Sequence, residues 1–419
     1  MNSLTEDSFL SLRTVTDGMR FFGHLYAHSL LIDCKSPNHE IVDHIINNPP
    51  YSLQYYNTAK FVGAALYAHV LSDMVYSTQQ NQLIAVRKLL RQDRVNALYL
   101  DIFRDKRELE IIDTFVKADI LFMPYKGKSL EIWLEMPECV RWKGDYDIYI
   151  KRDSLPNAIE CLSQIGYKPE RSIEGFPDEV HDFHLVKEKN ILIELHIGVY
   201  QDLPKSFEVD LWERSHRTIY FDNPVLRPDP VDLFILLAHH YLTHGWTQSF
   251  KWTADLISFV SSLYSEQKPD YLRRFTIDRL LEQVRKHSVS FQIATVFRII
   301  ENLSGLPYPE MLLSLPDGFT KHQKKIYDQL CDKKKWSTVT PDDLVFALRS
   351  DPKSIVNWKK TIWPSAEYVS NTMNRPVNSP FFFITRIQWM LRRLYRAGKV
   401  ILGIGKGDYR QSADMLIKK

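Results

Sequence analysis

An Asp-x-Asp motif at the start of an apolar run is the feature that most constrains this chain. Residues 144–150 read Gly-Asp-Tyr-Asp-Ile-Tyr-Ile and are rich in the side chains that favour β-strands. Because strand side chains alternate between two faces, Asp145 and Asp147 point one way and the apolar residues point the other. Neighbouring carboxylates repel each other unless a cation lies between them. The motif therefore predicts a strand with one buried face and one face that binds a divalent metal ion.

A second predicted strand, over residues 191–199, repeats this arrangement. Residues 191–197 read Ile-Leu-Ile-Glu-Leu-His-Ile, so the isoleucines and Leu195 form an apolar face and leave Glu194 and His196 on the other. Residues 181–187 precede it as another strand, and Glu-Lys-Asn at 188–190 indicates a hairpin between the two. We expect Glu194 to join Asp145 and Asp147 as the third metal ligand, and His196 to orient Glu194 or contact a substrate.

The segment Tyr-Lys-Gly-Lys-Ser at 125–129 supplies groups that bind phosphate. Lys126 and Lys128 carry fixed positive charge, as does Arg141, and Gly127 has no side chain to keep a phosphate from the backbone. Ser129 is expected to cap a helix over 129–134, whose first amides can bind an anion. These features predict a polyphosphate beside the carboxylates, and paired divalent ions held by shared carboxylates catalyse phosphoryl transfer.

Together these motifs resemble the uncharacterised nucleotidyltransferase group of the DNA polymerase β-like superfamily. The resemblance includes the Lys-Gly turn, Arg-x-x-Gly-Asp-x-Asp and the hydrophobic-Glu-Leu-His strand, and it continues into residues 232–244 and 252–256, covering about 106–260. It implies transfer of a nucleoside monophosphate from a nucleoside triphosphate such as ATP, with release of pyrophosphate and with Mg²⁺ or Mn²⁺ as the metal. It assigns the catalytic and metal-binding roles to Asp145, Asp147 and Glu194. The residues expected to bind nucleotide are Lys126, Gly127, Lys128, Ser129, Arg141 and His196.

The fold class that follows is α+β, with a small mixed-sheet catalytic unit flanked by N- and C-terminal helical bundles. We expect an N-terminal helical region over 1–105 and a catalytic domain over 106–225. A helical domain over 226–350 and a C-terminal segment over 351–419 follow. Helical periodicity is found over 154–165, 231–244, 250–263, 277–301 and 321–331.

The C-terminal segment carries a basic amphipathic helix. From residue 381 onward there are nine Lys or Arg and two Asp, so with a net charge of +3 the preceding 380 residues carry about −4. Ile384, Ile387, Leu391 and Leu394 fall on one helical face, with arginines around them. The helix can dock on the acidic remainder of the chain, contact nucleic acid, or bind an anionic membrane or a partner protein.

Composition excludes several other classes. The chain is 44% apolar and 25% charged, which is typical of a globular protein, and no run reaches the roughly 18 apolar residues of a membrane span. Its four cysteines contain no Cys-x-x-Cys pair, which disfavours a zinc ribbon or a disulfide framework. The N-terminus has no basic and apolar leader, so we expect a cytoplasmic protein.

Two other functions and one histidine cluster stay open at this point. Asp-x-Asp can also hold the metal of a sugar-nucleotide glycosyltransferase, and a helical scaffold can bind nucleotide without catalysis. The acceptor can be a small molecule, a peptide or protein, or RNA. His239, His240 and His244 have part of the spacing of a zinc site but no clear third ligand, which favours structural or site-lining histidines, with Asp255 as a partner for one of them.

Overall fold

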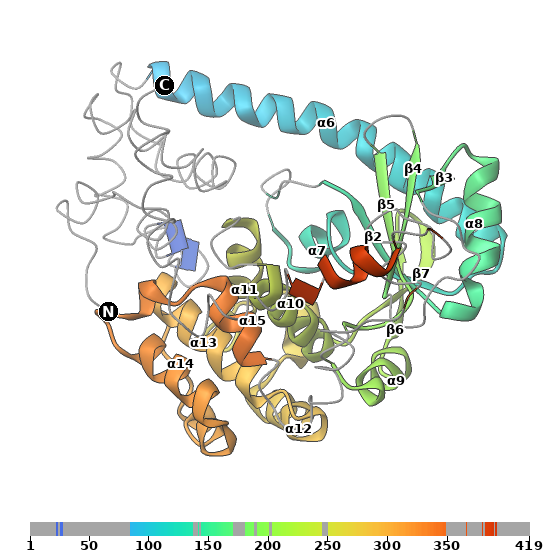
Figure 1. Cartoon of the computed structure of the whole chain (residues 1–419). Helices are drawn as coiled ribbons and strands as arrows, with labels where there is room; N and C mark the ends of the chain where they lie inside the picture. The colour runs from blue at the N-terminus through green and yellow to red at the C-terminus, as the bar shows by residue number, and fades with distance from the viewer. Residues whose placement is uncertain are drawn as a thin grey trace.

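The computed structural model describes most of the chain from residue 84 to residue 348. The described residues are 22–23, 26–27, 84–136, 141, 144–170, 181–187, 191–200, 203–244, 250–348, 366, 379, 382–388 and 390–391. A β-sheet lies at one end of this part of the molecule and a group of helices at the other (Figure 1). The expected mixture of helices with a small sheet is confirmed.

A five-stranded mixed sheet forms the centre of the predicted catalytic unit. Its strands, in spatial order, are β1 (Phe122–Pro124), β2 (Tyr146–Ile150), β5 (Ile191–His196), β4 (Asp182–Lys187) and β3 (Lys168–Pro169). β2 and β5 run parallel, and the other neighbours run antiparallel. The predicted hairpin between 181–187 and 191–199 is therefore confirmed, although its second strand ends at His196, and the two motif strands lie side by side.

The apolar face of the sheet is covered by two helices. Helix α6 (Ile84–Lys117) and helix α8 (Leu155–Gln164) pack on it, and α8 ends before Gly166 as the sequence predicts. Tyr146, Ile148 and Ile150 of β2 share this core with Ile193 and Leu195 of β5. The side-chain alternation predicted for both strands is thus confirmed.

Helix α6 continues through the predicted boundary at residue 105. It comprises 34 residues from Ile84 to Lys117, and neither Gly nor Pro occurs within it. Nothing in this stretch stops a helix, so the first half of α6 and the half that packs on the sheet form one element. The chain therefore has no break between 105 and 106, and the expected N-terminal bundle lies largely outside the described residues.

A second, two-stranded sheet was not predicted. After helix α9 (Lys205–Glu213), β6 (His216–Tyr220) and β7 (Asn223–Arg227) form an antiparallel hairpin. Phe221 and Asp222 at its turn both have positive φ, at 48° and 59°. Such a turn usually contains Asn-Gly or Asp-Gly, and neither pair is present here, so the sequence lacked the usual signal.

The helices after the hairpin form the largest core of the described chain. They are α10 (Pro230–His244), α11 (Phe250–Ser261), α12 (Ile277–His287), α13 (Ser290–Ser304), α14 (Lys321–Cys331) and α15 (Pro341–Leu348). Single 3₁₀ turns occur at Arg152–Ser154, Asp270–Arg274, Glu310–Leu312, Leu315–Gly318 and Trp336–Thr338. The expectation of one helix over 277–301 was wrong, because Ser288 adopts a left-handed conformation with φ 57° and ends α12.

Asp229 joins several of these elements. Its buried carboxylate accepts a hydrogen bond from the backbone N–H of Val231 at 3.1 Å and so caps α10. It also pairs with Arg214 after α9 at 3.0 Å and with Arg279 of α12 at 2.8 Å. These contacts fix the start of α10, which passes close to the sheet.

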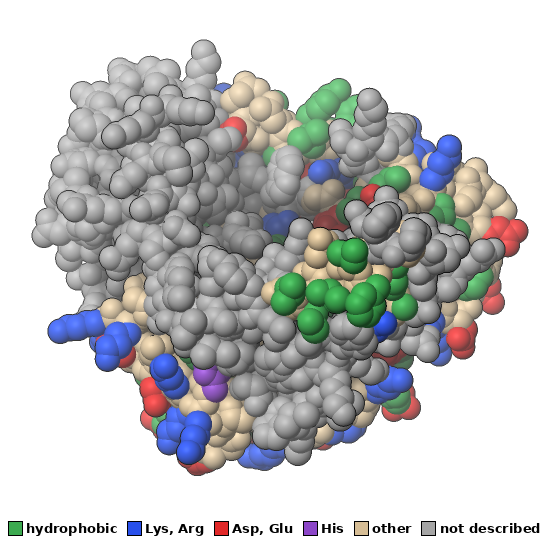
Figure 2. Space-filling view, in the orientation of Figure 1, with side chains coloured by type: hydrophobic (Ala, Val, Ile, Leu, Met, Phe, Trp, Pro, Cys, Tyr) green, Lys and Arg blue, Asp and Glu red, His purple; other side chains and the backbone are tan. Residues whose placement is uncertain are grey.

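The described part of the tail is helical, but its buried face differs from the one predicted. Phe382 and Thr385 are buried, at 7% and 1% exposure, whereas Ile384 and Leu391 are 49% and 55% exposed. Hydrophobic side chains are visible on the front face where this segment lies (Figures 1 and 2). Residues 392–419, with most of the basic side chains, lie outside the described residues. Among the described helices, none is long and apolar enough to cross a membrane.

Candidate active site

The polar face of the sheet carries two rows of ionisable side chains. Asp147 of β2 pairs in register with Glu194 of β5, which in turn pairs with His184 of β4. Tyr149, His196 and Asp182 form the next row in the same way. Registered neighbours project to the same face, so the strands bring together carboxylates that lie far apart in the sequence.

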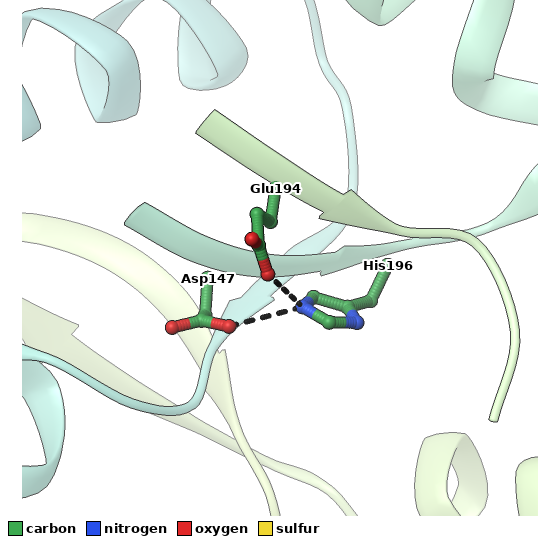
Figure 3. A group of neighbouring side chains, drawn as sticks. All are labelled: Asp147, Glu194 and His196. Carbon is green, nitrogen blue, oxygen red and sulfur yellow. Dashed lines mark hydrogen bonds and ion pairs between the residues drawn. The ribbon is translucent and has the colours of Figure 1, made fainter. Parts of the chain in front are cut away.

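Asp147, Glu194 and His196 form a compact group of potential metal ligands. One oxygen of each carboxylate and one imidazole nitrogen all lie within 4.8 Å of one another. His196 Nε2 is 3.1 Å from Asp147 Oδ1 and 3.8 Å from Glu194 Oε2, and all three side chains point to a common centre (Figure 3). Mg²⁺ and Mn²⁺ prefer carboxylate oxygens as ligands. An imidazole nitrogen also binds transition metals, but it binds Zn²⁺ more strongly than Mn²⁺.

Asp145 lies in a bend immediately before β2, beside this group. Partial burial, followed by repulsion from Asp147, raises the pKa of Asp145, while Lys126 and Lys251 of α11 oppose the shift. The expected ligand triad was Asp145, Asp147 and Glu194. The structure brings all three to one face but places His196, and not Asp145, closest to the other two.

Lys126 forms a buried ion pair with Asp147. Its Nζ is 2.8 Å from Asp147 Oδ1, and the lysine is 7% exposed. Burial alone would lower the pKa of Lys126, but the negative charge of Asp147 outweighs it and the pKa is raised. Burial would also raise the pKa of Asp147, yet Lys126 and His196 hold it below its usual value. Both groups are therefore charged at neutral pH.

Glu194 is in the opposite electrostatic situation. Burial, with repulsion from Asp147 and Asp145, raises the pKa of Glu194 to about 7. His184 contacts its outer oxygen, with Nε2 3.8 Å from Oε1. His184 is itself held by Asp182 and by Glu170 of the neighbouring loop, each at 3.3 Å. The hydrogen bond to Asp182 raises the pKa of His184 to about 8, so His184 places a positive charge beside Glu194 that only partly offsets burial and repulsion there.

The Lys-Gly turn lies at the other side of β2. Gly127 precedes helix α7 (Lys128–Trp133) with φ 64° and ψ −131°, and Lys128 pairs with Glu131 at 3.0 Å. The prediction that Ser129 caps this helix was wrong: Gly127 occupies the cap position, and the Ser129 hydroxyl donates to the carbonyl of Lys126 at 2.8 Å.

A small pocket beside this turn contains basic and acidic groups. It is lined by Arg104, Glu108, Lys126, Gly127, Lys128, Gly144, Asp145, Tyr146 and Asp147. Figure 2 shows a hollow below helix α6 in which Lys or Arg and Asp or Glu side chains are visible. Arg104 of α6 was missed in the sequence, because it lies 22 residues before Lys126 in a long helix with no motif around it.

Gly127 should be the more sensitive of the two glycines in this pocket. Its φ and ψ lie in a region that is open almost only to glycine, so Gly127→Ala is expected to lower the free energy of unfolding by about 1–3 kcal/mol. Gly144→Ala is the matched control, because a Cβ there would meet nothing within 4 Å. Urea unfolding of both variants measures the difference, and equal stability of the two would contradict a strained turn.

Arg141 does not line this pocket but forms a buried ion pair with helix α11. Its Nε and Nη2 donate to both oxygens of Asp255, at 2.9 to 3.1 Å, and the two residues are 3% and 1% exposed. Asp255 was expected to bind a histidine of α10. In the structure Asp255 instead pairs with Arg141, and this ion pair connects the segment before β2 to α11.

The histidines of α10 lie close to the carboxylates. Tyr125 donates to or accepts from His196 at 3.0 Å and hydrogen-bonds Tyr200, whose hydroxyl contacts His240 Nδ1 at 3.0 Å. His240 and His244 do not join a three-ligand metal group among the described residues. His239 is buried against Tyr200, with ring centroids 5.0 Å apart, so the α10 histidines lie beside the tyrosines that reach His196. These tyrosines were missed because single tyrosines carry no spacing signal.

A small mixed sheet with paired carboxylates beside a Lys-Gly turn is the arrangement that we expect of a nucleotidyltransferase. A family model, described as "Uncharacterised nucleotidyltransferase", matches residues 63–301. This match covers more than half of the chain, so the chain belongs to that family of nucleotidyltransferases. No curated protein and no solved structure matches it.

Proposed function

We propose that the protein transfers a nucleoside monophosphate from a nucleoside triphosphate to an acceptor hydroxyl group, with release of pyrophosphate. The observation that supports this most directly is the direct pairing of Asp147 and Glu194 on adjacent strands, with ligand atoms within 4.8 Å beside His196. The Lys-Gly turn, whose Lys126 and Lys128 line a pocket with Asp145 and Asp147, adds to it, and so does the family to which the chain belongs.

The donor set fits a divalent cation. Two carboxylates converge with an imidazole. Burial, followed by repulsion from its acidic neighbours, raises the pKa of Glu194, and a bound cation would offset that repulsion. Asp147 and Glu194 would hold the ion, with His196 or Asp145 beside them. When bound, a divalent ion would polarise the phosphate and make the acceptor hydroxyl more acidic.

The residues of the turn and of the sheet divide the remaining tasks. Lys126 keeps one ammonium N–H on Asp147 and has two others to donate to phosphate oxygens. Gly127 leaves its backbone open to the departing pyrophosphate, and Lys128 and Arg104 supply charge near it. Glu194, on the other side of Asp147, orients the attacking hydroxyl and accepts its proton as the hydroxyl oxygen bonds to the α-phosphorus and pyrophosphate leaves.

Incubation with each of the four α-³²P-labelled nucleoside triphosphates, Mg²⁺ or Mn²⁺ and a host-cell extract tests this proposal. We expect the label from one or more nucleotides to move to a small molecule, a protein or RNA, with equimolar pyrophosphate. Asp147→Asn should show no transfer. A glycosyltransferase would instead move the sugar of a sugar nucleotide, and a binding scaffold would bind nucleotide with no labelled product; either result would contradict the proposal.

A further inference from the structure

We propose that Tyr200, His240, His244 and Trp252 form the binding site for the nucleobase of the triphosphate, a suggestion that rests on the proposed function. We call these four residues the ring wall. It consists of Tyr200, which follows β5, two histidines of α10 and one tryptophan of α11.

The order of strands in the sheet indicates where the nucleobase lies. In an in-line phosphoryl transfer the leaving and attacking oxygens lie on opposite sides of the phosphorus. The Lys126 turn, next to β2, marks the pyrophosphate side, and Glu194 and His184 on β5 and β4 mark the acceptor side. The reaction axis therefore runs along the sheet, and we place the nucleoside at the equatorial position on the phosphorus that points away from the sheet.

The elements above this face are α10 and α11. They lie on the opposite side of the sheet from α8 (Figure 1). The charge of Lys251 on α11 lowers the pKa of Asp145. The charge of Lys126 lowers the pKa of His244, and the charge of Asp147 raises it. A chain of hydrogen bonds also runs from Asp147 through His196, Tyr125 and Tyr200 to His240. The ring wall is thus connected to the carboxylates through this chain and lies near enough for their charges to act on its histidines.

The geometry of the ring wall suits a flat aromatic ligand. His240 and His244 are nearly stacked, with ring centroids 4.3 Å apart at 31°, and the Trp252 indole meets His240 edge-on at 4.8 Å and 87°. His240 and Trp252 are half-buried and His244 is exposed, so these three rings keep accessible surface. Tyr200 is buried, at 7% exposure, and packs against His181 and His239, so it supports the other three rings rather than stacking on a ligand. Tyr200 holds His240 in place through its hydroxyl.

The ring wall is also uncharged at neutral pH. Burial lowers the pKa of His240 well below its usual value, and the positive charge of Lys126 adds to the effect. Burial lowers the pKa of His244 in the same direction. Neutral rings stack on any base, whereas the phosphates are drawn to Lys126 and Lys251. The site therefore separates a phosphate end from a base end.

Binding of two probes tests this assignment. The first is the set of α,β-methylene nucleoside triphosphates with Mg²⁺, and the second is inorganic tripolyphosphate with Mg²⁺, which has no base. Trp252→Leu and His244→Ala are expected to weaken nucleotide binding by about 5- to 150-fold, from 1–3 kcal/mol per stacked base. Both variants should bind tripolyphosphate within about twofold of the unchanged protein. Isothermal titration calorimetry measures all of these affinities.

Trp212→Leu is the matched control, because Trp212 is another half-buried tryptophan but lies on α9, where the ammonium of Lys151 lies over its ring, and not on α10 or α11. It should leave both affinities unchanged. Unchanged nucleotide binding in Trp252→Leu and His244→Ala would overturn the base site and leave the proposed function standing. An equal loss of affinity for nucleotide and for tripolyphosphate would do the same. A full-length protein that binds neither probe would overturn the proposed function together with the base site.

Discussion

Glu194→Gln is expected to reduce nucleotidyl transfer by on the order of a thousandfold or more while leaving the folded protein at least as stable at pH 8. The loss of activity follows because glutamine keeps the size of Glu194 but removes the charge that would bind a cation. The variant is expected to be at least as stable because, without a bound cation, burial and repulsion from Asp147 and Asp145 disfavour the charged form of Glu194. The variant removes that repulsion.

The pH dependence of stability gives this prediction a second test. Glu194 has a pKa of about 7 in the folded chain and an ordinary value of 4.5, so the folded state binds the proton more tightly than the unfolded state. The stability that this group contributes is complete below pH 4.5 and is lost as the pH rises to about 7. In EDTA, the unchanged protein should lose stability across this window, and Glu194→Gln should lose less.

Metal addition completes the comparison. Mg²⁺ or Mn²⁺ at pH 8 should raise the melting temperature of the unchanged protein and have little effect on Glu194→Gln. Glu160→Gln, an exposed glutamate of α8 on the far side of the sheet, should behave as the unchanged protein in every assay. Equal stabilisation of all three proteins by metal would show that Glu194 is not a ligand.

The part of the site that lies on single strands could be predicted from the sequence. Asp147 and Glu194 are each flanked by apolar residues at alternate positions, so each strand has one buried and one polar face whatever its neighbours are. The hairpin of β4 and β5 was likewise local, because its turn residues are adjacent in the chain. These features depend on short-range geometry that the sequence contains directly.

Contacts between distant segments could not be predicted in the same way. Arg141 was expected to bind nucleotide because of its place before the motif, but its partner, Asp255, lies 114 residues later. Tyr200 and His240 meet only because α10 folds back over the sheet. The break at Ser288 was missed for a related reason, since a non-glycine residue in the left-handed conformation has no reliable sequence signal.

Arg141→Ala is expected to lower the free energy of unfolding by about 3–5 kcal/mol. The substitution leaves the carboxylate of Asp255, which is 1% exposed, without the guanidinium that binds both of its oxygens. Because Lys251 and Trp252 lie within one turn of Asp255 on α11, loss of this pair should also displace the helix that faces Asp145. Nucleotide binding should weaken as a secondary effect, and urea denaturation measures the primary one.

The double variant Arg141→Ala with Asp255→Ala separates a structural ion pair from a phosphate contact. With both charges gone no buried charge is left unpaired, so we expect the double variant to be more stable than Arg141→Ala alone, with a coupling energy of about 1–3 kcal/mol. Arg273→Ala, from an ion pair in which both side chains are largely exposed, should change stability by less than about 1 kcal/mol. If Arg141 acts mainly on the triphosphate, Arg141→Ala will keep its stability and lose affinity for both nucleotide and tripolyphosphate, which would restore the role that the sequence predicted.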